Sequence, residues 1–259
     1  MKTMNSDLGS VVDKYRDLVQ RYGYSSYLLS NRALHIKSLE DALLRVRARF
    51  SGERIRIADL GCGYGVLGRI TADYLGATEL LCVDLDPERL KIAEKLCDRV
   101  LQIDITSSEL GERFSEKYHL IIMHGVLEHV YDWDAVMANI GSMLVNDGFL
   151  LLSTPNLGSW VNRLLLLLGY QPRDLEISWR GLFGVFKTRR YGTVPIGHVK
   201  IATYRALVEY LESFSFKIIR AYPLYSREHP LILMIDKILH PFPSLSRRVM
   251  ILAQKISKT

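Results

Sequence analysis

Residues 54–65 read Arg-Ile-Arg-Ile-Ala-Asp-Leu-Gly-Cys-Gly-Tyr-Gly, an apolar segment that runs into three closely spaced glycines. Its isoleucines alternate with arginines, which is the pattern of a strand. Gly61, Gly63 and Gly65 then permit a sharp turn and let the backbone pass close to a ligand. A helix beginning just beyond them would direct free N–H groups to the same place. The stretch therefore predicts a strand, a loop that binds a nucleotide-type cofactor, and a helix.

The spacing of the glycines separates two classes of cofactor. A dinucleotide-binding loop needs G-x-G-x-x-G, whereas this loop is G-x-G-x-G and Val66 stands at the third-glycine position. Asp59 precedes the first glycine by two residues, and a carboxylate there repels a pyrophosphate but attracts a cation. S-adenosylmethionine (SAM) carries an ammonium and a sulfonium and no phosphate. The loop therefore favours SAM, and the alternatives are a plain strand-to-helix turn or a departed NAD loop.

Two further apolar segments end in acids, as a cofactor-binding βαβ unit requires. Residues 80–83 lead to Asp84, which lies about 20 residues after the loop, where a ribose-binding acid belongs. A carboxylate there can accept hydrogen bonds from both ribose hydroxyls. The next apolar segment, 99–103, ends at Asp104. The alternative for both acids is that they only solvate the ends of strands.

Together these segments resemble motif I and its neighbours in the class I SAM-dependent methyltransferases, over roughly residues 54–222. The resemblance implies that SAM is the cofactor and assigns Asp104, with Ile105 beside it, to the adenine. The residues expected to bind the cofactor are Asp59, Gly61, Cys62, Gly63, Gly65, Asp84, Leu85, Asp104, Ile105 and His124.

The order of the expected elements predicts an α/β, Rossmann-like fold in a single domain, residues 1–259, with an N-terminal helical extension over 1–52. Alternating strands and helices imply parallel βαβ units. The expected strands are 54–60, 79–84, 99–104, 118–124, 148–154, 216–222 and 246–255, and the expected helices are 65–76, 87–97, 133–145, 158–169, 203–214 and 229–240. Residues 157–200 interrupt the alternation as an inserted cap. The resemblance implies a mostly parallel seven-stranded sheet with helices on both faces and an antiparallel last strand.

Candidate catalytic residues follow the fourth expected strand. Residues 126–130, Val-Leu-Glu-His-Val, resemble a segment of the ubiquinone O-methyltransferase group and its relatives, which implies small-molecule or lipid-like acceptors. A hydroxyl acceptor needs a base or a metal to remove its proton. The candidates are Glu128, His129, His124 and His198. The Asn/Asp-Pro-Pro-Tyr motif of the DNA amino-methyltransferases is missing from this strand end, which disfavours that chemistry.

The same segment argues against a metal. Some relatives, including small-RNA 3′-end methyltransferases, bind a divalent ion through E-x-x-E-H and a downstream His. Glu128 and His129 match the second half of that pattern, but Gly125 stands where the first Glu should be, so we expect no metal. The structural alternatives are that His129 only hydrogen-bonds backbone and that Glu128 only favours a helix N-terminus.

Charge is unevenly distributed along the chain. The net charge of +6 divides into −4 over residues 1–155 and +10 over residues 156–259. The basic half predicts an anionic acceptor, a nucleic acid or a membrane surface, and a solvated basic surface is the alternative. In the cap, Leu164–Leu168 and the basic cluster 187–190 suit an amphiphile or a peripheral membrane contact. No RNA-binding module accompanies them, which disfavours nucleic acid.

Cysteine usage and the N-terminus indicate the compartment. Cys62, Cys82 and Cys97 are odd in number and lack metal spacing, so we expect reduced, cytosolic cysteines. Residues 1–20 lack the apolar core of a signal peptide, and no apolar run approaches a membrane span. We therefore expect a cytoplasmic protein, with peripheral membrane association as an option.

The function expected from these features is O-methylation of a small-molecule or lipid- or glycan-linked acceptor. The alternatives are an RNA methyltransferase, a non-catalytic SAM-binding regulator and an NAD-dependent enzyme. The sequence leaves open the acceptor and the methylated atom, the participation of a metal, and the oligomeric state.

Overall fold

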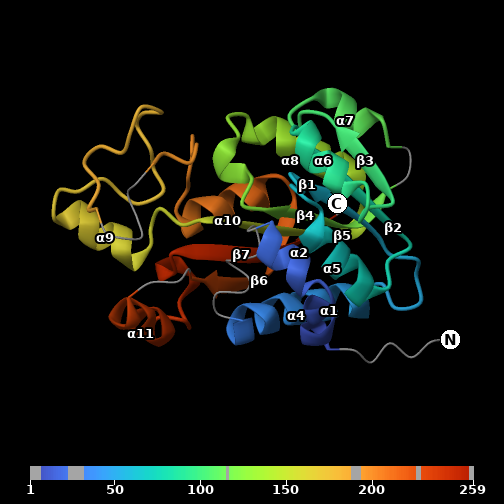
Figure 1. Cartoon of the computed structure of the whole chain (residues 1–259), viewed down its shortest axis with the longest axis horizontal. Helices are drawn as coiled ribbons and strands as arrows, with labels where there is room; N and C mark the ends of the chain where they lie inside the picture. The colour runs from blue at the N-terminus through green and yellow to red at the C-terminus, as the bar shows by residue number, and fades with distance from the viewer. Residues whose placement is uncertain (1–6, 23–31, 115–116, 188–193, 226–228, 257–259) are drawn as a thin grey trace.

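The computed structural model describes residues 7–22, 32–114, 117–187, 194–225 and 229–256 (Figure 1). Before the sheet, the described residues form helices α1 (Leu8–Lys14), α2 (Arg16–Arg21) and α4 (Arg32–Arg49). Asp7 caps α1 by accepting a hydrogen bond from the Ser10 N–H. The helical extension expected before the first strand is therefore confirmed over these ranges.

The sheet has seven strands in the order β3-β2-β1-β4-β5-β7-β6. Strands β1 to β5 pair in parallel, and β7 runs antiparallel to both of its neighbours, as expected. The strands are β1 (Arg56–Leu60), β2 (Glu79–Asp84), β3 (Arg99–Gln102), β4 (Tyr118–His124), β5 (Leu144–Pro155), β6 (Phe216–Leu224) and β7 (Arg248–Lys255). The expected fold class is confirmed.

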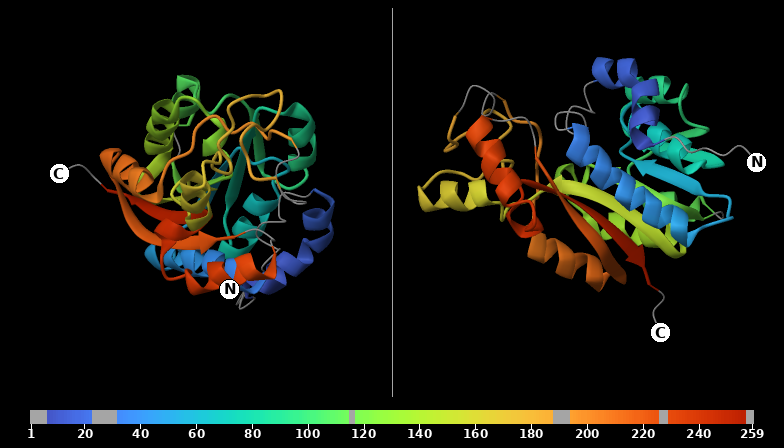
Figure 2. Two further views of the ribbon diagram at one scale, coloured as in Figure 1. Left: turned by 90° about the vertical axis from the view of Figure 1, so that its left-hand side faces the viewer. Right: turned by 90° about the horizontal axis from the view of Figure 1, so that it is seen from below.

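Helices cover both faces of the sheet, and each face has its own core (Figure 2). The central strands are apolar on both sides, because alternate residues serve opposite cores. On β4, Leu120 and Ile122 face one core while Ile121 and Met123 face the other. Residues of α1, α4, α5 (Val66–Leu75) and α6 (Pro87–Ala93) join the first core, and residues of α7 (Ser108–Glu112), α8 (Trp133–Met143) and α10 (Tyr204–Ser213) join the second.

One strand boundary differs markedly from expectation, and one short helix was not expected. The fifth strand begins at Leu144 rather than at residue 148, so Asp147 and Gly148 lie inside β5, where Asp147 adopts a φ of 60°. The short helix α7 was not expected. A five-residue helix shows too little periodicity to be read from sequence.

The inserted segment contains α9 (Trp160–Leu167), and α11 (Pro230–Ile238) lies close to it at one end of the molecule (Figure 1). Single turns of 3₁₀ helix, η1 (Leu127–His129) and η2 (Pro243–Leu245), follow β4 and precede β7. Among the described helices, none has both the length and the apolar character needed to cross a membrane.

The expectation that all three cysteines are reduced is wrong for two of them. Cys82 on β2 and Cys97 beyond α6 form a disulfide, with their Cα atoms 6.1 Å apart, while Cys62 is buried and free. The chain between them carries α6, which packs on β2 and returns Cys97 to the strand. Their separation of 15 residues carries no sign of this proximity, so counting cysteines could not reveal it.

We expect Cys97→Ser to lower the free energy of unfolding by about 3 kcal/mol, because a disulfide closing a loop of this length restricts the unfolded chain. Urea unfolding with and without reductant measures the change. Reductant should destabilise the wild type and leave Cys97→Ser unaffected. Three titratable thiols in the denatured, unreduced wild type would contradict the disulfide.

Candidate active site

A cavity of about 620 Å³ opens at the carboxyl ends of β1 to β4. This is the edge at which parallel α/β sheets bind ligands. Five of the residues expected to bind the cofactor line it, namely Gly61, Asp84, Leu85, Asp104 and Ile105. One of the expected catalytic residues, His129, lines it too.

The glycine loop contributes Gly61 to the wall of this cavity, and this position has no room for a side chain. Gly61 has a φ of +70°, and a Cβ there would lie 2.4 Å from the Val126 side chain. The Gly61 and Cys62 N–H groups donate to the carbonyl of Val83, at 2.8 and 3.0 Å. The Gly63 N–H donates to Asp84 Oδ2 at 2.8 Å. The end of β2 therefore holds the loop against the cavity.

Asp84 and Asp104 stand at the ends of neighbouring strands, as expected. Asp84 also accepts a hydrogen bond from the Asp86 N–H at 3.0 Å, so each of its carboxylate oxygens already accepts one backbone N–H. Asp104 is exposed, and its Oδ1 accepts from the N–H and the hydroxyl of Thr106, both at 2.8 Å. Since a carboxylate can accept about four hydrogen bonds, both side chains can still bind hydroxyl or amino groups.

Asp59 is the buried acid of the site. It is 3% exposed, and its Oδ2 atom has no hydrogen-bond partner. Burial raises the pKa of Asp59 to about 7. An uncompensated carboxylate oxygen beside the glycine loop suits a cationic group, because a positive charge there would offset the cost of burying the negative one.

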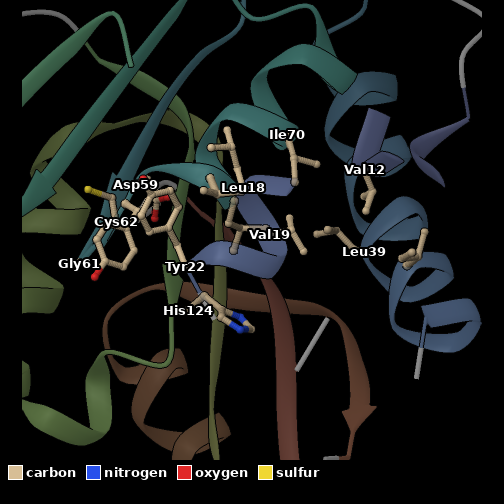
Figure 3. Close-up of a pocket in the computed structure, with 14 residues that line it drawn as sticks. Val12, Leu18, Val19, Tyr22, Leu39, Asp59, Gly61, Cys62, Ile70 and His124 are labelled. Atoms are coloured by element: carbon tan, nitrogen blue, oxygen red, sulfur yellow. The ribbon is translucent and has the colours of Figure 1, made fainter. Parts of the chain in front are cut away.

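A second, largely apolar pocket lies beneath the N-terminal helices (Figure 3). Val12, Val19 and Leu39 from these helices form one side. The other side brings together four of the residues predicted for the site, Asp59, Gly61, Cys62 and His124. Since Gly61 lines this pocket as well as the larger cavity, the two meet at the glycine loop.

His124 was expected both to bind the cofactor and to act in catalysis, but its ring lines the second pocket and not the larger cavity. Its Nδ1 lies 2.6 Å from Ser153 Oγ. Burial, with a further contribution from Arg248, lowers the pKa of His124 to about 4. The ring is therefore neutral at physiological pH.

The other three catalytic candidates come together where β4 ends. Glu128 and His129 lie on η1, and the rings of His129 and His198 are 4.9 Å apart between centroids. His198 Nε2 lies 4.0 Å from Glu128 Oε1. The backbone joins the two segments as well, because the Val199 N–H donates to the Glu128 carbonyl at 2.8 Å. The end of the inserted segment thus lies against η1, next to the cavity that His129 lines.

Backbone carbonyls orient both imidazoles. His129 Nδ1 lies 2.9 Å from the Gly197 carbonyl oxygen, and His198 Nδ1 lies 3.0 Å from the carbonyl oxygen of Asp174. A carbonyl oxygen only accepts, so Nδ1 of each ring carries a proton. In the neutral ring, Nε2 then holds the lone pair that can accept another proton. Of the two rings, His129 is exposed and lines the cavity, whereas His198 is buried.

Sequence reasoning missed Arg248, the first residue of β7. Its Nη2 atom forms an ion pair with Glu128 Oε1 at 2.6 Å, and Glu128 is 1% exposed. No motif marks this arginine, and the pair spans 120 residues. The only signal was a basic residue placed directly before the apolar run of the last strand.

The ion pair bears on metal binding. Glu128, His129 and His198 have ligand atoms within 4.8 Å of one another, close enough to hold an ion. The guanidinium of Arg248, however, already neutralises Glu128 and lies 3.5 Å from where a Gly125 Cβ would stand, the position of the missing first Glu. A divalent cation would have to compete with this fixed positive charge.

Part of the chain is similar in sequence to known proteins. Residues 58–150 match the model of a methyltransferase domain. A ubiquinone biosynthesis O-methyltransferase from Xanthomonas axonopodis pv. citri is 32% identical over 115 residues, 43% of this chain and 47% of that protein. A ribosomal protein L11 methyltransferase from Trichlorobacter lovleyi is 32% identical over 146 residues, 55% of this chain and 45% of that protein. The chain spans about half the length of these relatives.

Solved structures share the fold. A SAM-dependent methyltransferase from Clostridium acetobutylicum superposes with a TM-score of 0.56 at 16% identity, covering 96% of this chain and 99% of that one. A second, from Archaeoglobus fulgidus, gives 0.53 at 16% identity, covering 93% of this chain and 99% of that one. At this level of identity the likeness concerns the fold.

The burial of Asp59 predicts a pH-dependent stability difference. Because the folded protein raises the pKa of Asp59 to about 7, from 3.8, it holds a proton that the unfolded chain releases. The contribution of Asp59 to the free energy of unfolding is therefore most favourable below pH 4 and is lost as the pH rises towards 7. We expect Asp59→Asn to be more stable than the wild type at pH 8 by about 2–4 kcal/mol and to lose much of that margin at pH 5.

Urea unfolding of both proteins without ligand, at the two pH values, measures this difference. Asp73→Asn is the matched control. Ion pairs with Lys14 and Arg69 lower the pKa of Asp73, so removing this carboxylate should destabilise the protein. An equal margin for Asp59→Asn at both pH values would contradict the elevated pKa.

Proposed function

We propose that this chain, which carries a class I SAM-dependent methyltransferase domain, transfers the methyl group of SAM to a hydroxyl oxygen of a small or lipid-linked molecule. One observation carries the choice of oxygen. The ring of His129 lines the cavity with its Nδ1 proton committed to Gly197, which leaves Nε2 to accept the proton of a hydroxyl group.

The residues present fit SAM. Asp84 offers lone pairs to the ribose hydroxyls, and Asp104 with Ile105 offers a polar and an apolar contact to the adenine. The unpartnered oxygen of Asp59 suits the cationic methionine end, which the junction of the two cavities at Gly61 would admit. The cofactor, when bound, supplies a methyl group on a positively charged sulfur, which is a good leaving group.

The chain's own contribution is alignment and proton transfer. The loop at Gly61 and the acids at the strand ends fix one reactant, and holding reactants in line is the main requirement of a displacement at carbon. His129 Nε2 takes the hydroxyl proton as the oxygen attacks. His198 packs against the His129 ring, and the Glu128–Arg248 pair holds the segment that carries both rings.

The acceptor is proposed from the cavity rim and from the relatives. Tyr131 and Ile196 line the cavity and are strongly exposed, so an apolar body can lie against them. The ubiquinone biosynthesis O-methyltransferases among the relatives support an oxygen acceptor. The excess of positive charge after residue 155 supports an anionic group on the same molecule. The cytoplasmic location stays a prediction.

Cofactor binding is tested with Asp84→Asn. We expect the affinity for SAM and for S-adenosylhomocysteine to fall at least about tenfold, since the variant loses charge-assisted hydrogen bonds to the ribose and weakens the hold on Gly63. Calorimetric titration measures both ligands. Asp86→Asn is the matched control, because Asp86 does not line the cavity and its side chain caps α6 and pairs with Arg89. A melting temperature raised by NAD and not by SAM would refute the cofactor.

The role of His129 is tested with His129→Ala, using radiolabelled SAM and dihydroxybenzoates as probe acceptors. We expect kcat to fall about 100-fold or more while the affinity for SAM is unchanged, because the cavity loses the group that accepts the hydroxyl proton. His229→Ala, outside the cavity, is the matched control. If the wild type binds SAM and methylates neither the probes nor an RNA pool, the non-catalytic regulator is favoured; RNA methylation favours the RNA enzyme.

A further inference from the structure

Helix α11 buries an acidic side chain and exposes an apolar stripe. A surface helix of a globular protein normally buries its apolar stripe and exposes its polar face. On α11 the fully buried residue is Asp236, at 3% exposure, while Leu231, Met234 and Ile238 are exposed, the last to 66%. Their spacing places these three side chains along one stripe of the helix.

Specific contacts fix this orientation. The Asp236 carboxylate accepts hydrogen bonds from the guanidinium of Arg247, at 2.7 and 3.1 Å, and from the Trp160 Nε1–H at 2.9 Å. Asp236 and Arg247 are both buried, and a buried charge without its partner is costly. Rolling α11 to bury its apolar stripe would break these contacts, so the outward direction of the stripe is specified by the fold.

Helix α9 exposes apolar side chains at the same end of the molecule. Leu164, Leu166, Leu167 and Leu168 are all exposed, Leu167 to 82%. The bond from Trp160 at the start of α9 to Asp236 joins the two helices, which lie near each other in both figures of the whole chain (Figures 1 and 2). We call the exposed faces of α9 and α11 the outer platform.

The platform lies at the cavity edge of the sheet. Strand β5 ends at Pro155, just before α9, and Pro155 pairs with Arg248, the first residue of β7, to which α11 leads. Both helices therefore project beyond the carboxyl ends of the parallel strands, the edge at which the cavity opens.

The exposed charged side chains described in the segments that carry the platform, residues 157–187 and 229–242, are all positive. Arg163, Arg180, Lys187 and Lys237 are exposed. The acids described over residues 157–187 and 229–242 are Asp174, Glu176 and Asp236, and none of these three is exposed. Exposed aromatic rings, Trp179, Phe183, Phe186 and Phe242, belong to the same segments. Aliphatic and aromatic side chains ringed by cations suit the interface of an anionic lipid bilayer.

We propose that the outer platform docks the protein on an anionic lipid surface, with α9 and α11 lying in the interface and the cavity edge facing the membrane. A second copy of the chain is a poorer occupant, because it would bring like charges together. Nucleic acid is poorer as well, because bases stack on rings, whereas the strongly exposed apolar side chains of α9 and α11 themselves are aliphatic and the exposed rings lie outside these two helices. The proposal depends on the fold and not on the proposed reaction.

The test is co-sedimentation with vesicles of phosphatidylcholine alone or mixed with phosphatidylglycerol, at low and high salt. We expect binding to the mixed vesicles at low salt, at least tenfold weaker binding to neutral vesicles, and a further loss at high salt. The double variant Leu167→Asp, Ile238→Asp should lose binding at least tenfold. Leu44→Asp is the matched control, because Leu44 is an exposed leucine on α4, away from the platform.

Melting curves verify that each variant is folded, and SAM titration reports the cavity independently. Vesicle binding by the folded double variant equal to that of the wild type would overturn the proposal. So would a wild-type dimer, detected by sedimentation equilibrium, that the double variant abolishes. Failure of SAM to bind while vesicle binding persists would contradict the proposed function and leave the platform standing.

Discussion

The ion pair between Glu128 and Arg248 is the interaction on which the candidate active site of this molecule depends. Glu128 contacts Arg248 of the last strand through its carboxylate and lies 4.0 Å from His198, while its own carbonyl receives the N–H of Val199. One buried residue thus joins β7, the turn after β4 and the end of the inserted segment. Because both charges are buried, losing either would leave the other uncompensated, which makes this junction costly to break.

The grouping of the candidate cofactor residues at one edge of the sheet could be predicted from the sequence, and the reason is local. Gly61, Asp84 and Asp104 each follow a strand, and parallel strands in sequence bring their carboxyl ends to one edge. The contacts that complete the site lie far apart in the chain. Neither the pairing of Glu128 with Arg248 nor that of Cys82 with Cys97 leaves a local pattern, so both had to come from the structure.

For the helix expected over residues 229–240 and for His124, the sequence could not predict which way the side chains face. Residues 229–240 were expected to form an amphipathic helix, but the direction of its apolar face depends on Arg247 and Trp160, which periodicity cannot reveal. His124 was predicted at the site from its place at a strand end; its ring lines the second pocket, with Nδ1 beside Ser153, and its role stays a prediction. In the basic cluster 187–190, residues 188–190 lie outside the described part of the chain, so that cluster stays a prediction.

The hydrogen bond between His129 Nδ1 and the Gly197 carbonyl joins parts of the chain that the ribosome synthesises at different times. The cofactor loop and the acids at the strand ends are all translated within the first 105 residues, whereas Gly197 and Arg248 come from the last quarter of the chain. A ribosome delivers the N-terminal part first. The residues proposed to bind the nucleoside of the cofactor therefore leave the ribosome well before Gly197 and Arg248, so the proposed cofactor site is synthesised before the contacts that complete the proposed site of proton transfer.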